Sequence, residues 1–130
     1  MLKKLISLSL AGLLTSVIAF AAQAAEKVNY DAKSFAAAQA AGRPILVEIR
    51  ASWCPTCKAQ EPILGNLEKH DRFRNLLVVL VDFDSQKEAV RAFGAQMQST
   101  LIAFRGSVET GRSVGDTNAT SIATLLDKTI

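Results

Sequence analysis

The chain has little of several residue types on which specialised folds and sites depend. Its 130 residues include only two cysteines, one histidine, three prolines and one tryptophan. A disulfide-stapled scaffold needs several bridges between distant segments, so two cysteines exclude that class. A structural zinc site needs four ligands, and two cysteines with His70 do not supply them. His70 lies in the charged run 68–72, which predicts a solvated helix end.

Excess positive charge is also scarce outside the first residues. The formal net charge is +3, and two of the contributing lysines are Lys3 and Lys4. Removal of the first segment therefore leaves a charge of about +1, which is too small for the electrostatic footprint of nucleic-acid binding. We expect no nucleic-acid partner.

Residues 1–24 have the pattern of a secretory signal peptide. The two lysines precede an uncharged apolar run, Leu5–Ala22, and Ala22-Gln23-Ala24 has small residues at the positions that signal peptidase reads. We expect cleavage there and a periplasmic or secreted protein that is free of the membrane. The alternative is an uncleaved membrane anchor, since about 18 apolar residues can just span a bilayer. In either case residues 25–130 are predicted to form one domain.

The remaining chain alternates between helical and strand-like segments and has no repeats or low-complexity tracts. Helices are expected at 30–41, 55–69, 86–93 and 117–129, and strands at 45–49, 76–81, 100–104 and 108–114. Pro62 predicts a kink within the second helix. Strands separated by helices pair in parallel, and the last two form a hairpin. The pattern therefore predicts an α/β fold, with a mixed sheet covered by helices.

Both cysteines lie in one motif, Cys54-Pro55-Thr56-Cys57, between a predicted strand and a predicted helix. A helix N-terminus favours a thiolate at Cys54, and Pro55 suits the first helical turn. Cys57, one turn further on, can attack a mixed disulfide on Cys54. We expect the Cys54 sulfur to be exposed and the Cys57 sulfur to lie behind it. Half of a zinc site and a copper(I) site are the competing interpretations of the motif.

The segment Leu46–Lys58, followed by Pro62, resembles the strand, active site and kinked helix of the thioredoxin family. Trp-Cys-x-x-Cys with a proline five positions after the second cysteine is a specific pattern, and the stretch 100–115 resembles the later strands of the family. The resemblance implies a thioredoxin-like fold whose central mixed sheet has four to five strands. It implies a redox-active disulfide, with Cys54 as nucleophile and Cys57 as resolving thiol, and neither a cofactor nor a metal. The resemblance also implies a monomer that exchanges electrons with protein thiols and disulfides.

The resemblance also implies a substrate-binding surface around the motif. Its members are the residues beside the cysteines and a loop that pairs its backbone with the substrate chain: Trp53, Pro55, Thr56, Gln98, Ser99 and Thr100. Trp53 either shields the disulfide or is simply packed there. The family has a cis-proline where this chain has Ser99. A cis bond without proline costs about 3–4 kcal/mol, so we predict a trans Gln98–Ser99 peptide. We also hypothesise that the Ser99 hydroxyl donates to the Cys54 thiolate and makes the couple more oxidising.

Glu48 matches the position where the family often keeps a buried acid beneath the second cysteine. Burial in an apolar strand raises the pKa of a carboxyl group, which can then accept the Cys57 proton. The alternative is a structural ion pair with Arg50, two residues on and on the same strand face. Arg50 itself replaces the family's apolar residue, and it either stabilises the Cys54 thiolate or reaches solvent.

Together these features predict an extracytoplasmic thiol–disulfide oxidoreductase. We expect it to reduce protein disulfides, with a membrane electron-transfer protein as its own reductant, although Pro55 and Thr56 do not fix the direction of electron flow. A copper(I)-binding module and a structural adaptor are the alternatives.

Overall fold

The computed structural model describes residues 24–130, so the predicted leader lies outside the described residues apart from Ala24. The elements are, in chain order, β1 (Glu26–Asn29), α1 (Ala32–Ala40), β2 (Pro44–Arg50), α2 (Pro55–Leu67), a 3₁₀ turn η1 (Asp71–Phe73), β3 (Leu77–Asp82), α3 (Lys87–Ala92), β4 (Thr100–Arg105), β5 (Val108–Val114) and α4 (Ala119–Asp127). No helix in this part of the chain is long and apolar enough to cross a bilayer.

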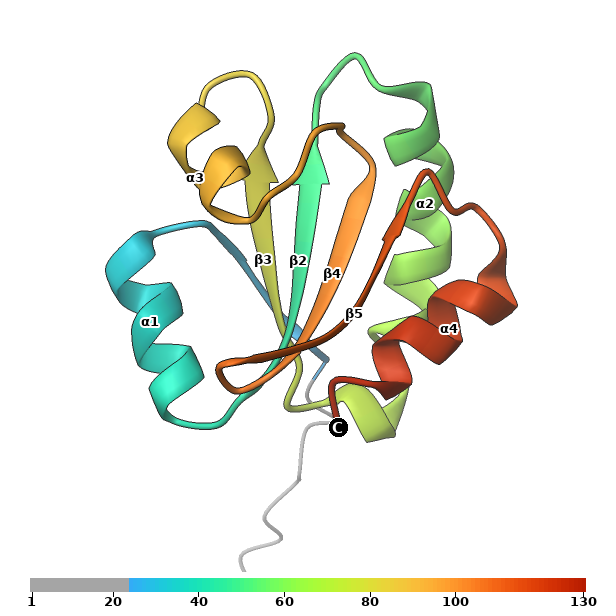
Figure 1. The fold of residues 1–130 in the computed structure, drawn as a ribbon. Helices are drawn as coiled ribbons and strands as arrows, with labels where there is room; N and C mark the ends of the chain where they lie inside the picture. The colour runs from blue at the N-terminus through green and yellow to red at the C-terminus, as the bar shows by residue number, and fades with distance from the viewer. Residues whose placement is uncertain (1–23) are drawn as a thin grey trace, which may run out of the picture.

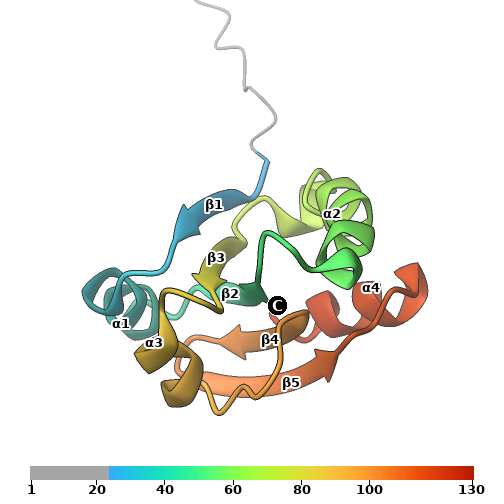
Figure 2. The ribbon, with the colours of Figure 1, turned by 90° about the horizontal axis from the view of Figure 1, so that it is seen from above.

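Five strands form one mixed sheet in the order β1-β3-β2-β4-β5. The first three strands of this order are parallel, whereas β4 runs antiparallel to both β2 and β5. Helices α1 and α3 cover one face and α2 and α4 cover the other (Figures 1 and 2). The predicted mixed sheet flanked by helices is therefore confirmed.

The sequence did not predict β1. This strand is the four-residue segment Glu-Lys-Val-Asn, and only Val28 is even partly buried. An edge strand with so little apolar character has no hydrophobic pattern of its own. Pairing with β3 determines the conformation of this segment, so the strand could not be predicted from its own sequence.

Alternation along β2 divides the core into two layers and fixes where the polar residues of this strand lie. Ile45, Val47 and Ile49 pack in the layer beneath α1 and α3, whereas Leu46 packs in the layer beneath α2 and α4. Since side chains two residues apart share a face, Glu48 and Arg50 belong to the α2 side of the sheet. The central strand thus points its two charged residues at the helix that begins at the cysteines.

Candidate active site

Cys54 and Cys57 form a disulfide at the N-terminus of α2, with their Cα atoms 5.3 Å apart. Cys54 is the N-cap of this helix and Pro55 occupies its first turn. The backbone N–H of Cys57 donates to Cys54 Sγ at 3.0 Å. In the reduced protein the same donor and the positive end of the helix dipole both favour a Cys54 thiolate over a thiol.

The expectation that the Cys54 sulfur is exposed was wrong. Cys54 has 0% relative exposure and Cys57 has 7%, and both pack with Ala51 and Phe83. Trp53 and Pro55 on either side of Cys54 are exposed, while Thr56 is half-buried. The oxidised centre therefore lies directly beneath the surface, and the protein has to open locally before a partner sulfur can reach it.

Trp53 extends into solvent beside the disulfide and is fixed in orientation. Its side chain is 54% exposed, and the indole Nε1–H donates to Asp84 Oδ2 at 2.7 Å. Asp84 belongs to the segment between β3 and α3. The hydrogen bond, rather than core packing, holds the ring next to Cys54.

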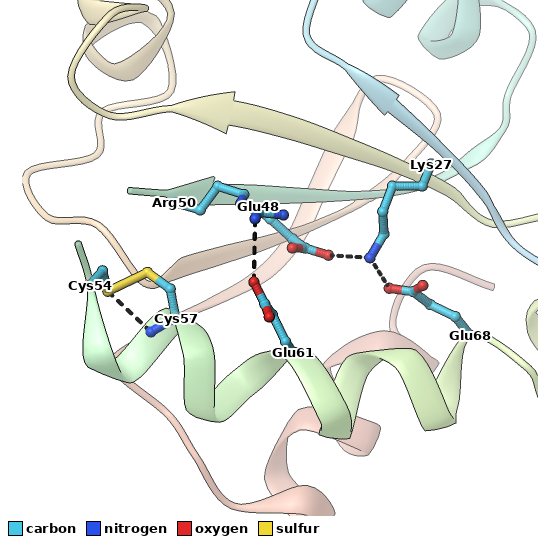
Figure 3. Close-up of polar contacts among 7 residues, drawn as sticks. All are labelled: Lys27, Glu48, Arg50, Cys54, Cys57, Glu61 and Glu68. Atoms are coloured by element: carbon cyan, nitrogen blue, oxygen red, sulfur yellow. Dashed lines mark hydrogen bonds and ion pairs between the residues drawn. A yellow bond between two sulfur atoms is a disulfide. The ribbon is translucent and has the colours of Figure 1, made fainter. Parts of the chain in front are cut away.

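A cluster of three charged side chains lies between the sheet and the C-terminal half of α2 (Figure 3). Lys27 Nζ is 3.7 Å from Glu48 Oε1 and 3.0 Å from Glu68 Oε1, so one ammonium group faces two carboxylates. Burial is the main cause that raises the pKa of Glu48, and repulsion from Glu68 raises it as well. Attraction to Lys27 and to Arg50 acts in the opposite direction and lowers this pKa. In Figure 3 the Glu48 carboxylate points toward Lys27, and the disulfide lies in the other direction along α2.

The predicted alternative of a Glu48–Arg50 ion pair was also wrong. Arg50 Nη2 instead reaches Glu61 Oε1 in α2 at 3.3 Å, and 38% of its side chain is exposed, in keeping with the alternative that it reaches solvent. Its stabilising effect on the Cys54 thiolate stays a prediction. The partners of Glu48 were missed because Lys27 lies in β1, the strand that the sequence pattern did not reveal. Glu68 follows α2 directly, and its carboxylate could be placed only once the helix was packed on the sheet.

Ser99 has a trans peptide bond, as predicted, since residues 24–130 contain no cis peptide. Its backbone is in the left-handed region, at φ +59°. The hydroxyl donates to the Gln98 carbonyl at 2.5 Å, so it is not aimed at the Cys54 sulfur in this oxidised structure. Thr100, the next residue, donates its own hydroxyl to Met97 O at 2.7 Å. The predicted loop is thus closed by local hydrogen bonds.

His70 is exposed, as expected of a solvated helix end. Among the residues that the structure describes, no group of three or more histidine, cysteine or acidic side chains is placed to hold a metal ion.

The comparisons with known proteins identify the family. The thioredoxin family profile matches residues 26–128. The chain belongs to the thioredoxin family. It carries the fold and the dithiol centre of a thioredoxin-type thiol–disulfide oxidoreductase.

Three relatives illustrate the degree of similarity. The crystal structure of Trxlp from Edwardsiella tarda is 40% identical with a TM-score of 0.76, and the match covers 78% of this chain and 98% of that one. Thioredoxin Asp f 29 of Aspergillus fumigatus is 30% identical, over 69% of this chain and 82% of its own length. A bifunctional thioredoxin reductase/thioredoxin of Mycobacterium leprae is 34% identical over 65% of this chain, but the match spans only 18% of that longer protein.

Proposed function

We propose that this protein reduces disulfide bonds in other proteins, in a compartment outside the cytoplasm. The observation that carries the proposal is the Cys54–Cys57 pair at the N-terminus of α2, with the Cys57 N–H directed at the Cys54 sulfur. A buried carboxyl group on the adjacent strand supports it, as does the signal-peptide pattern of residues 1–24.

The chemistry requires two successive exchanges. The Cys54 thiolate attacks one sulfur of a substrate disulfide, forms a mixed disulfide and releases the other substrate sulfur as a thiolate, which takes a proton from solvent. Cys57 then loses its proton, attacks Cys54 Sγ and releases the second substrate sulfur. Two electrons pass to the substrate, and this protein is left with the Cys54–Cys57 disulfide.

Glu48 is the proposed acceptor of the Cys57 proton, and because its carboxylate points toward Lys27 in the oxidised structure, the side chain has to turn toward Cys57 for this step. Its side chain is buried on the α2 face of β2, and its raised pKa makes it a better base than an exposed carboxylate. Lys27 keeps part of the negative charge stabilised while the proton is absent. Exposed Trp53 and Pro55 and half-buried Thr56 and Gln98 are the proposed contacts for the substrate chain. Ser99 and Thr100 are only 4% and 1% exposed in the oxidised form, so the same local opening that uncovers Cys54 has to uncover them before they join these contacts.

The proposed cycle needs a source of two electrons to regenerate the dithiol. A membrane electron-transfer protein that reduces the disulfide from the extracytoplasmic side fits the predicted location. We propose that the protein acts as a monomer.

Trapping variants test this function directly. Cys57→Ser is expected to accumulate a mixed disulfide with a protein substrate such as insulin, because the resolving sulfur is missing, whereas Cys54→Ser is expected to trap nothing. Wild-type protein is expected to reduce insulin, and equilibration with glutathione gives the reduction potential that fixes the direction. Equal trapping by the two variants, or no insulin reduction by the wild type, would overturn the proposal.

A further inference from the structure

Gln60 is a buried polar residue on the same face of α2 as the resolving cysteine. It is 3% exposed, and the buried residues of this helix are Cys57, Gln60 and Leu64, which recur at the helical spacing. A polar side chain at such a position needs hydrogen-bond partners, because an unpaired buried amide is costly. Gln60 has them in two segments distant in sequence.

The side-chain amide of Gln60 links the Ser99 loop to the segment between β5 and α4. Its Nε2 donates to Ser99 O at 3.3 Å and to Asp116 O at 2.8 Å. The amide nitrogen has two hydrogens, so one group can serve both carbonyls. Ser99 O also accepts the backbone N–H of Gly115 at 2.9 Å. Two donors from different elements therefore hold this one carbonyl.

Ser99 needs such restraint because its backbone conformation is unfavourable for a residue with a side chain. Its φ of +59° lies in the left-handed region, where Cβ crowds the backbone. Residues persist there when surrounding contacts fix them. Three contacts do so here: the bonds from Gln60 and Gly115 to the carbonyl, and the bond from the Ser99 hydroxyl to Gln98 O.

The position of this loop connects the restraint with the redox centre. Thr100 pairs with Ile49 in the sheet, so Ser99 lies at the end of β2, where the chain turns toward Cys54. Gln60 starts from the same helix as both cysteines, one turn beyond Cys57. The amide therefore joins the loop to the first two turns of α2.

We propose that Gln60 is a positioning residue that holds the Ser99 loop in the shape that receives the backbone of a substrate polypeptide. This inference rests on the proposed function, because it specifies how that substrate is held. The Gln60 side chain does not touch the reacting sulfurs. Its contribution is to keep the carbonyl of Ser99 turned inward and the flanking backbone fixed before the substrate arrives.

The decisive measurement compares two kinds of substrate in a Gln60→Met variant, which keeps the length of the side chain and removes its donor. A protein disulfide needs the loop for alignment, whereas a small aromatic disulfide has no backbone to align. We expect the rate with insulin to fall by about tenfold and the rate with the small disulfide to change by less than about twofold, since misplacement of an aligning group acts through orientation.

Leu64→Ala is the matched control. It removes packing from the same face of α2 one turn further along, in the core layer beneath α2 and α4, and it removes no hydrogen bond to the Ser99 loop. We expect a lower Tm and an unchanged ratio of the two rates. An equal loss with both substrates in Gln60→Met would overturn the proposal, because it would indicate general damage to the fold.

A measurement on the wild-type protein does not depend on whether a variant folds. We expect the side-chain amide hydrogens of Gln60 to exchange with solvent much more slowly than those of exposed Gln96. Equal exchange of the two side chains would also overturn the proposal. If wild-type protein reduces neither disulfide, the proposed function fails, while the exchange experiment still decides whether Gln60 anchors the loop.

Discussion

Lys27 Nζ lies 3.7 Å from Glu48 Oε1, although β3 separates the two strands to which these residues belong. The long lysine side chain extends over the intervening strand on the side that faces α2. It reaches there a carboxylate that the sheet and helix bury, and it contacts Glu68 as well. The short edge strand therefore supplies the cation that offsets charge at the proposed proton acceptor.

Removal of this cation is expected to change the pH dependence of the second exchange. Lys27 lowers the pKa of Glu48, so Lys27→Met raises that pKa further. A higher pH is then needed to ionise the carboxylate, and the acidic limb of the rate profile moves to higher pH. Release of substrate from the mixed disulfide, followed as a function of pH, measures the shift. Lys33→Met, at an exposed lysine of α1, is the control, and coincident profiles for all three proteins contradict the prediction.

Glu48→Gln is expected to stabilise the protein at neutral pH. The pKa of Glu48 in the folded state is raised above its ordinary value of 4.5, chiefly by burial. Folding therefore favours the protonated group, whose contribution to stability is complete below that ordinary value and is lost as the pH rises through the raised pKa. The amide carries no charge and avoids this loss.

Denaturant unfolding at a series of pH values is the measurement. The difference in the free energy of unfolding between Glu48→Gln and wild type is expected to shrink as the pH falls from the raised pKa of Glu48 toward its ordinary value of 4.5. A difference that is constant with pH would show that Glu48 does not titrate in this way.

The hydrogen bond between Trp53 and Asp84 can be tested optically, since Trp53 is the only tryptophan of the chain. Asp84→Ala releases the indole, and we expect faster depolarisation of its fluorescence. The cost in the free energy of unfolding is expected to be about 1 kcal/mol or less, as for a partly exposed hydrogen bond. Asp116→Ala, which alters an acidic residue that does not contact Trp53, serves as the control. Unchanged anisotropy in Asp84→Ala contradicts the assignment.

The burial of Cys54 predicts slow reduction of the native disulfide by small thiols. Attack requires local opening, so the rate depends on the population of the open form. We expect glutathione to reduce the folded protein at least about tenfold more slowly than an oxidised peptide with the sequence Cys-Pro-Thr-Cys, because an opening free energy of about 1.4 kcal/mol lowers the open population tenfold. We also expect low urea concentrations to accelerate the reaction before the protein unfolds globally. Equal rates for protein and peptide would mean that the sulfur is accessible without opening.

The sequence predicted most of the framework because strong local patterns specify it. The apolar runs of β2, β3 and β4 and the amphipathic pattern of α4 lie within a few residues of their expected positions. The Cys-x-x-Cys motif between a strand and a helix also determined where the redox centre lies. These features depend on residues close together in the chain, which a pattern can register.

Most of the contacts that the sequence did not predict join distant segments. The Lys27–Glu48 pair depends on β1, whose pairing to β3 no local pattern reveals. The burial of Cys54 depends on packing against Phe83, and the two bonds of Gln60 depend on how the loops at residues 99 and 116 close over α2. One indication for Gln60 was present in the sequence, which is its polar side chain on an otherwise apolar face of the helix. Such a position implies a hydrogen-bond partner but does not identify it.

The backbone N–H of Ala25 donates to the carbonyl of Glu68 at 3.2 Å, beside the cluster that contains Glu48. If peptidase cuts after Ala24, as the sequence predicts, this nitrogen becomes the free amino terminus and is largely protonated at neutral pH, since an α-amino group has a pKa of about 8. Export would then add a positive charge beside the backbone of Glu68, and the precursor lacks this charge. The exported form and its precursor would therefore differ in charge next to Glu68, whose carboxylate shares the Lys27 ammonium group with Glu48.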